Sequence, residues 1–394
     1  MQDSGTKKKI AKRVLTITLG ALFAYGLLLF VGFFAIKYGI TNTKGGVDSN
    51  SSVFNESASR LSYVLEAQAG ANSLVGSTIG KLKPDDAKPS GFDELKSRNA
   101  CKLNVISGLS FSNAGKISET YQDTKSDVLA SKMLLAVSLR LKNDSDFENR
   151  ISSCDQPDGA ASQQVLGASF PVENNPNAFT WANEDEWKTI RDSVIKDKDK
   201  IDKAAEIAGI EPRLIVSNLI VEQLRLFHSD RELFKKVFEP LKILSNATQI
   251  SLGVMGVKEK TAIDTENHLK DPSSPYYLGS RYEHVLDFAT GDIPKERFDR
   301  LTNDKDHYYS YLYAAMYLKE IMTQWKNAGY DIQYRPEIVG TLFNVGFSQS
   351  KPKPDPQVGG SKITIGDGDY SFGSLAYEFY YSGELSDDFP YVIK

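Results

Sequence analysis

Histidine and cysteine are scarce in this chain, which has four histidines and two cysteines among 394 residues. None of the histidines stands at a metal-ligand spacing such as HExxH, so the sequence predicts neither a metal site nor a cofactor. Positive charge is not in excess either, because the formal net charge is -4. Nucleic-acid-binding domains are usually clearly basic, and we therefore expect no nucleic acid as a partner.

One long apolar run interrupts the N-terminal sequence. Residues 14–36 carry no charge and follow a basic tail at residues 1–13. As a helix, the run would span about 34 Å, enough to cross a hydrocarbon core of about 30 Å. Basic residues favour the cytoplasmic side, so the sequence predicts a single-pass membrane protein whose remainder faces the periplasm or cell wall. A cleaved signal peptide is the alternative, although its apolar region is typically only ~7–15 residues long.

The next two segments differ in composition. Residues 37–59 are rich in Gly, Ser and Asn and predict a flexible tether. Residues 60–170 predict a small α(+β) membrane-proximal region of unknown role. Within it we expect helices over 58–68 and 126–141, and a strand over 103–111.

The two cysteines bracket this region. Outside the cytoplasm, Cys101 and Cys154 can form a disulfide, which would contribute about 4 kcal/mol in the chain-entropy model. Two buried free thiols are the alternative.

Residues 171–394 predict a mainly helical domain. Asn183, with Glu186 three residues later, resembles a capping box, and an apolar stripe then runs to Gly209, which ends the helix. Further helices are expected over 212–227, 233–244, 258–263 and 305–328, and from Pro336, a residue type favoured in the first turn. Residues 350–362 predict an extended, mobile loop.

The helix over 212–227 is apolar on nearly every side, which predicts burial. Its polar residues Asn218, Glu222 and Arg225 share one face at spacings of four and three. A carboxylate in such a helix is either paired or kept for chemistry. The structural interpretation is an ion pair with Arg225 on a solvated stripe, worth about 0.2–0.5 kcal/mol; such a cation favours the ionised carboxylate and opposes proton donation.

The order of motifs after Glu222 resembles a known family. GVMGVKEKTA (253–262) follows, then the Tyr-rich helix with YLYAAMYLKEIM, then LFNVG (342–346). This resembles the lysozyme-like lytic transglycosylases of the goose-type lysozyme superfamily, which cut peptidoglycan glycan strands. The resemblance covers about residues 181–347 and implies a lysozyme-like helical fold.

The resemblance also implies site residues. Glu222 matches the catalytic acid, and its neighbours in the motifs would bind substrate: Gln223, Ser251, Gly253, Val254, Met255, Phe343 and Asn344. The sequence departs from the family pattern at Gln223, usually Ser, and at Gly256, usually Gln. Glu259 replaces a Pro and Phe343 a Tyr, and the gap between Glu222 and Gly253 is extended.

The implied reaction needs one carboxylate. Glu222 would protonate the glycosidic oxygen between MurNAc and GlcNAc and then act as base while the sugar's own 6-hydroxyl forms 1,6-anhydroMurNAc. Apolar burial favours the protonated acid that this step requires. A hydrolytic goose-type lysozyme is the first alternative and would need a second carboxylate, with Glu239 or Glu259 as candidates. A catalytically silent wall-binding scaffold is the second, and a structural component of an envelope assembly, with partners the sequence does not name, is the third.

Overall fold

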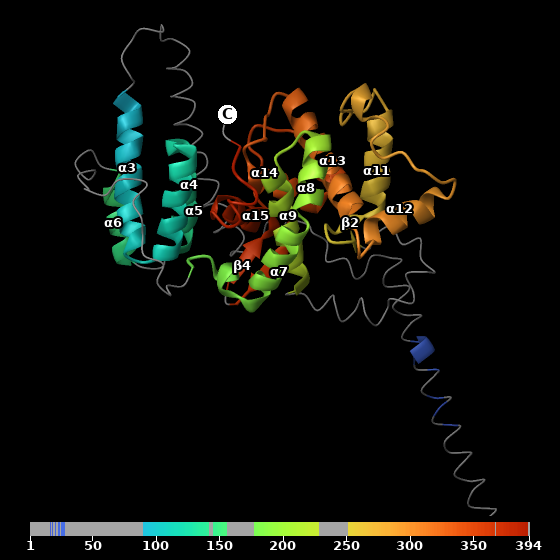
Figure 1. The fold of residues 1–394 in the computed structure, drawn as a ribbon, viewed down its shortest axis with the longest axis horizontal. Helices are drawn as coiled ribbons and strands as arrows, with labels where there is room; N and C mark the ends of the chain where they lie inside the picture. The colour runs from blue at the N-terminus through green and yellow to red at the C-terminus, as the bar shows by residue number, and fades with distance from the viewer. Residues whose placement is uncertain are drawn as a thin grey trace, which may run out of the picture.

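The computed structural model describes residues 16, 18, 20, 23, 25–27, 90–141, 145–155, 177–227, 251–366 and 368–392. These residues are mainly helical, as the sequence predicts, and they contain two antiparallel two-stranded ribbons. Figure 1 shows one group of helices, α3 to α6, standing beside a larger helical body that runs from α7 to the C-terminus.

The first group consists of α3 (Ser90–Ser107), α4 (Phe111–Thr124), α5 (Asp127–Leu141) and α6 (Ser145–Ser153). The helix expected over 126–141 is confirmed as α5. The strand expected over 103–111 is wrong, because these residues form the end of α3, a turn and the start of α4. Leu103, Val105 and Ile106 are buried in a helix, and a short apolar run looks alike in a buried helix and a strand. The described part of the membrane-proximal region, 90–141 and 145–155, therefore has no strand.

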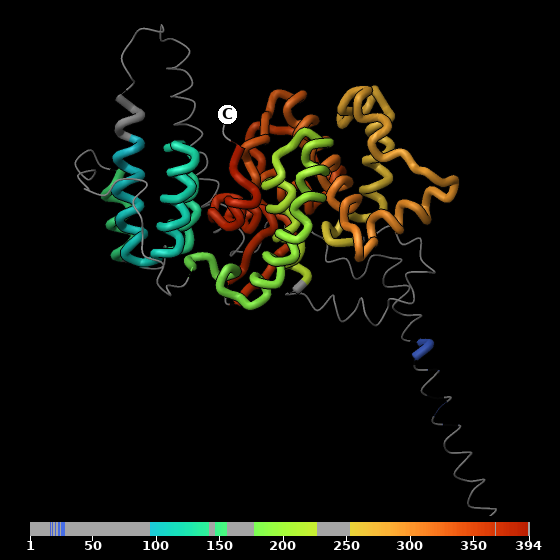
Figure 2. Tube along the Cα trace, viewed as in Figure 1, coloured from blue at the N-terminus to red at the C-terminus, as the bar shows by residue number. Residues whose placement is uncertain are grey.

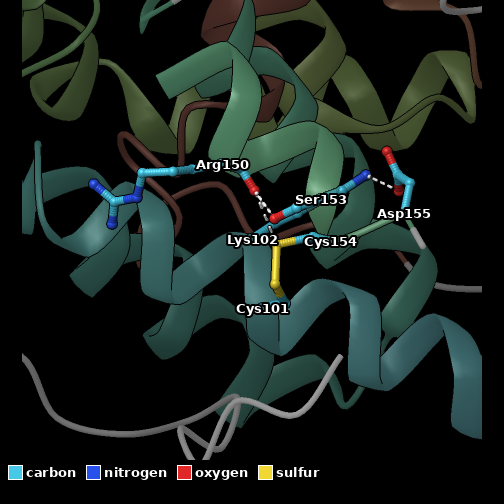
Figure 3. The surroundings of a disulfide bond; sticks show 6 residues. All are labelled: Cys101, Lys102, Arg150, Ser153, Cys154 and Asp155. Atoms are coloured by element: carbon cyan, nitrogen blue, oxygen red, sulfur yellow. Dashed lines mark hydrogen bonds and ion pairs between the residues drawn. A yellow bond between two sulfur atoms is a disulfide. The ribbon is translucent and has the colours of Figure 1, made fainter. Parts of the chain in front are cut away.

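A disulfide closes this group of helices. Cys101 of α3 is bonded to Cys154, which follows α6, with their Cα atoms 5.6 Å apart. Figure 3 shows the bond beside the ion pair between Lys102 and Asp155, whose Nζ and Oδ1 lie 2.7 Å apart. Both sulfur-bearing residues are buried. Since the bond joins the first and last helices of the group, it restrains both of its ends.

The larger body begins with η1 (Thr180–Asn183), α7 (Asp185–Lys196) and α8 (Lys198–Ala208), which Gly209 ends as expected. The expected capping box at Asn183 is wrong, because Glu184 is the N-cap of α7 and makes no side-chain cap bond. Asn183 instead closes the preceding turn: its Nδ2 donates to the Asn177 carbonyl and its Oδ1 accepts from the Asn177 N–H, both at 2.8 Å.

The expected continuous helix up to Gly209 is two helices that meet at Asp197. The carboxylate of Asp197 accepts a hydrogen bond from the Tyr311 hydroxyl at 2.8 Å and lies 2.5 Å from His307 Nδ1. Although burial opposes it, hydrogen bonding to His307, Lys200 and Tyr311 lowers the pKa of Asp197. Tertiary contacts with the start of α13 (Tyr308–Asn327) thus accompany the break, which the apolar spacing did not indicate.

The remaining elements follow in chain order. α9 spans Pro212–Phe227, β1 Ser251–Leu252 and β2 Val257–Lys258, followed by α11 (Glu259–Lys270), η3 (Ser280–Tyr282), α12 (Ile293–Thr302) and α13 (Tyr308–Asn327). The C-terminal part holds α14 (Pro336–Val345), η4 (Phe347–Gln349), β3 (Lys362–Ile365), β4 (Gly368–Ser371) and α15 (Phe372–Tyr381). The helices expected over 212–227, over 305–328 and from Pro336 are confirmed, and the one expected over 258–263 is confirmed and extends to Lys270.

α9 lies at the centre of this body. It packs against α7, α8, α13, α14 and α15, and the tube in Figure 2 shows it among them. Its apolar residues are accordingly almost completely buried, and burying one Leu, Ile or Val side chain is worth about 1.5–3 kcal/mol. Arg213, fully buried in the first turn, donates to the carbonyls of Tyr380 and Phe389 at 2.9 and 3.1 Å and so fastens the C-terminal segment to α9.

Ion pairs connect the two parts of the molecule. Arg140 of α5 pairs with Glu378 of α15, and Lys116 of α4 pairs with Glu384. The two carboxylates are buried. These ion pairs therefore join the α3–α6 group to α15 and to the segment that follows it. α15 in turn packs against α9 and α14.

Several expectations fall on other residues. The tether at 37–59 and the helices expected over 58–68 and 233–244 lie outside the described residues, as does most of the apolar run at 14–36. Within the described ranges, none of the helices combines the length and apolar character needed to cross a bilayer.

Candidate functional site

Glu222 lies in the third turn of α9 and is only 3% exposed. Asn218, one turn earlier, is fully buried; its Nδ2 donates to the Leu214 carbonyl at 2.8 Å, and its Oδ1 has no hydrogen-bond partner among the described residues. The polar stripe of α9 is thus an interior feature. The interpretation of this stripe as a solvated surface is wrong, because neighbouring helices cover α9 on nearly every side.

Arg225 holds the Glu222 carboxylate with a two-point contact. Its Nε donates to Oε2 at 3.0 Å and its Nη2 donates to Oε1. The Arg225 side chain is 12% exposed and that of Glu222 is 4% exposed. The predicted ion pair is therefore present, in a setting from which water is largely excluded.

The hairpin β1–β2 lies directly against this pair. Ser251 and Leu252 are opposite Lys258 and Val257, and the connecting turn contains Gly253 and Gly256. Both glycines have positive φ, at 63° and 60°. A Cβ at Gly256 would lie 2.0 Å from Glu222 Oε1, so the backbone approaches the carboxylate as closely as only glycine permits.

The position of Gly256 explains one departure from the family motif. The resemblance places a Gln here, whose side chain would contact sugar or the acid. In this chain the Glu222 side chain occupies the space that a side chain at 256 would need. The observed position of the Glu222 side chain therefore requires a glycine at 256.

Other motif residues fix the hairpin. Gln223 Nε2 donates to the Val254 carbonyl at 2.5 Å, and the Met255 N–H lies 3.4 Å from Ser310 Oγ of α13. Met255 is fully buried. Gly253 is held closely too, since a Cβ there would lie 1.9 Å from the Leu301 carbonyl oxygen. These predicted substrate-binding residues are brought together with Glu222, but Gln223 and Met255 make contacts that belong to the fold.

The LFNVG segment forms the end of α14 and its C-cap, Gly346. Phe343 is buried, with its ring centroid 5.3 Å from that of Tyr317. Asn344 Oδ1 accepts from the backbone N–H and the hydroxyl of Ser361, at 2.7 and 2.9 Å. No described contact joins Phe343 or Asn344 to Glu222. The amide oxygen of Asn344 therefore supports the segment before β3.

Of the two candidates for a second carboxylate, only Glu259 lies among the described residues. Glu239 lies outside the described residues. Glu259 is the first residue of α11, where its charge acts on Arg297. On the same helix, Glu266 accepts from Arg297 Nε at 2.7 Å and from the Tyr313 hydroxyl at 2.6 Å, which ties it into the core.

The described residues contain no group of three or more His, Cys, Asp or Glu side chains that could hold a metal ion. What the site offers is one buried carboxylate, one guanidinium and the backbone of a tight turn. The sequence indicates Arg225 only as an ion-pair partner and Gly256 only as a departure from the family motif. The i,i+3 spacing predicts the contact between Arg225 and Glu222. No local pattern predicts the contact between Gly256 and Glu222, because the hairpin and α9 meet only in the tertiary fold.

Comparison of the chain with protein-family models, with curated proteins and with solved structures found no match. The resemblance to lytic transglycosylases therefore depends on the sequence motifs alone.

Proposed function

We propose that this protein is a peptidoglycan lytic transglycosylase with Glu222 as its acid and base. The observation that supports this most is the meeting of Glu222 and the GVMG turn. A buried carboxylate lies against a glycine backbone from a hairpin that follows it in sequence, in the order that the motifs imply. The proposal keeps the membrane anchor at 14–36, with the enzyme facing the cell wall, as a prediction from the sequence.

The reaction would proceed in two steps at one residue. The protonated Glu222 donates its proton to the glycosidic oxygen as the bond from C1 of MurNAc to that oxygen breaks. The resulting carboxylate then takes the proton of the 6-hydroxyl while O6 bonds to C1. Glu222 ends protonated, no water is consumed, and the product carries a 1,6-anhydro ring. General acid catalysis of this kind contributes about 10²–10⁴-fold.

A second candidate function is peptidoglycan binding without cleavage, and two observations favour it. Arg225 donates to both oxygens of the Glu222 carboxylate. The Asn344 amide oxygen is engaged by Ser361. A scaffold that retains the fold but not the reaction would have these features.

Incubation of the purified full-length chain with peptidoglycan, beside a Glu222→Gln variant, separates these functions. We expect anhydro-ended fragments from the parent, identified by mass spectrometry, and at least a ~10²-fold lower yield from the variant. Lys260→Gln, which removes an exposed charge on α11, is the matched control and should leave the yield unchanged.

Other products would redirect the interpretation. Fragments with reducing ends would keep the acid role of Glu222 and replace transglycosylation by hydrolysis. Folded protein that sediments with peptidoglycan and releases no fragments would contradict the enzyme and favour the scaffold.

A further inference from the structure

The charge of Arg225 has one counterpart among the described residues. Its Nε and Nη2 both donate to Glu222, and no other described carboxylate forms an ion pair with it. A guanidinium has five N–H donors, so further donors remain after these two bonds. With only 12% of the side chain exposed, water has limited access to that charge.

This pairing creates a conflict with the proposed reaction. To donate a proton, Glu222 must first be neutral. Protonating Glu222 would remove the one carboxylate that pairs with Arg225 among the described residues, and a largely buried cation that loses its partner is strongly unfavourable. The reaction therefore requires another anion to reach Arg225 when Glu222 takes up its proton.

We propose that Arg225 is the anion-binding residue of this site and that its ligand is a glycan carrying a free carboxylate. The carboxylate of the ligand replaces that of Glu222 on the guanidinium. Binding of the acidic ligand and protonation of Glu222 are then coupled, since each favours the other. This inference rests on the proposed function and makes Arg225 a specificity-determining residue, which selects acidic glycan strands over neutral ones.

The geometry suits such an exchange. Arg225 and Glu222 belong to the same helix, one turn apart, so a side-chain rotation separates them without moving the backbone. A planar guanidinium binds any carboxylate with the same two-point geometry that it offers Glu222. On its other side, Glu222 faces the backbone of Gly256, and no second cation among the described residues pairs with it.

Binding measurements test this without turnover. The probe is a peptidoglycan disaccharide-peptide with free carboxylates, and its methyl ester is the neutral reference. Calorimetry at low salt gives both dissociation constants for the full-length parent, Arg225→Gln and Glu222→Gln, with Lys260→Gln as the charge-matched control. For the parent we expect the acid to bind about tenfold more tightly than the ester, which corresponds to about 1.4 kcal/mol.

The two site variants should change this ratio in opposite directions. Arg225→Gln should bring it to about one, and Glu222→Gln, which removes the competing carboxylate, should raise it above the parent value. Lys260→Gln should leave it near the parent value. If Arg225→Gln does not fold, Arg225→Lys replaces it. A lysine keeps the positive charge but cannot make the two-point contact of a guanidinium, so we expect a ratio above one and below the parent value.

An equal ratio in the parent and the Arg225 variant would overturn the proposal, and so would absence of binding to either ligand. These outcomes are separate from the test of the reaction. A changed ratio without anhydro products would keep the anion site and reject the transglycosylase. Anhydro products with an unchanged ratio would keep the transglycosylase and reject the anion site.

Discussion

Two arginine–glutamate pairs of this molecule, each with a buried carboxylate, differ in how they are held. Arg140 and Glu378 are 238 residues apart and join the α3–α6 group to α15. Glu378 also accepts from Trp181 Nε1 at 3.3 Å, and the Arg140 guanidinium lies 4.0 Å from the centre of the Tyr370 ring. Arg225 and Glu222 are three residues apart on one helix.

The difference separates a structural pair from a candidate functional one. Burial raises the pKa of Glu378 while Arg140 and Trp181 oppose that rise, and its partners come from two other parts of the fold. This pair ties the two helical groups together. The Glu222 pair can open by a side-chain movement, and a releasable carboxylate is what an acid–base residue needs. Burial and pairing alone would not have distinguished them.

The largest effect on stability should come from breaking the first pair. Arg140→Gln leaves Glu378 buried without a cation, which typically costs about 3–5 kcal/mol. Urea unfolding should show a loss of that size. The control Arg150→Gln removes one partner of an exposed pair at 3.8 Å, worth at most about 1 kcal/mol. If both variants lost the same amount, the Arg140 pair would not be a buried structural pair.

The disulfide bears on the Arg140 pair because it stabilises the α3–α6 group of helices, which supplies Arg140. The double substitution Cys101→Ser and Cys154→Ser opens a loop with a sequence separation of 53 residues. We expect a loss of about 2–4 kcal/mol, since the unfolded chain regains conformational freedom. Thermal unfolding with and without a reductant should reproduce this loss in the parent and show no change in the double variant. Identical melting of oxidised and reduced parent would contradict the expectation.

Glu320 of α13 is a further buried carboxyl, and His268 is its one ion-pair partner among the described residues. Its side chain is fully buried, Oε1 has no hydrogen-bond partner among the described residues, and Oε2 lies 3.3 Å from His268 Nδ1. Burial raises the pKa of Glu320 well above its ordinary value and lowers the pKa of His268. Burial therefore favours the neutral, protonated form of Glu320 in the folded protein over the form it has in water.

This difference predicts a pH-dependent stability. In the unfolded chain Glu320 ionises above about pH 4.3, while the folded form keeps its proton to a higher pH. The unfolded state then binds fewer protons, so stability falls as pH rises through this window, by up to about 1.4 kcal/mol per pH unit. Glu320→Gln should remove this loss and raise the melting temperature at pH 7 relative to the parent, with little difference near pH 4.

The matched control is Glu119→Gln on the exposed side of α4, which should melt like the parent at both pH values. A Glu320→Gln variant whose melting temperature differs from that of the parent by the same amount at pH 4 and pH 7 would show that Glu320 ionises normally in the folded protein.

Local sequence determined much of the secondary structure. Apolar spacing and terminal signals gave α5, α9, α13 and α14, because helix periodicity and the roles of Pro and Gly at helix ends are properties of neighbouring residues. The two errors in secondary structure have the opposite cause. The break at Asp197 and the helix at Leu103–Ser107 depend on contacts with segments far away in the chain, and no periodicity in a short window reports those contacts.

The candidate site divides in the same way. Helix periodicity predicts that Glu222 lies in a buried helix and that Arg225 shares its face, because residues three apart are neighbours on any helix. Three other contacts form only in the folded chain: Gly256 lies against the Glu222 carboxylate, Ser361 donates to Asn344, and Arg140 pairs with Glu378. These contacts join residues 17 to 238 positions apart, and the packing of whole helices, each burying its apolar face, brings them together.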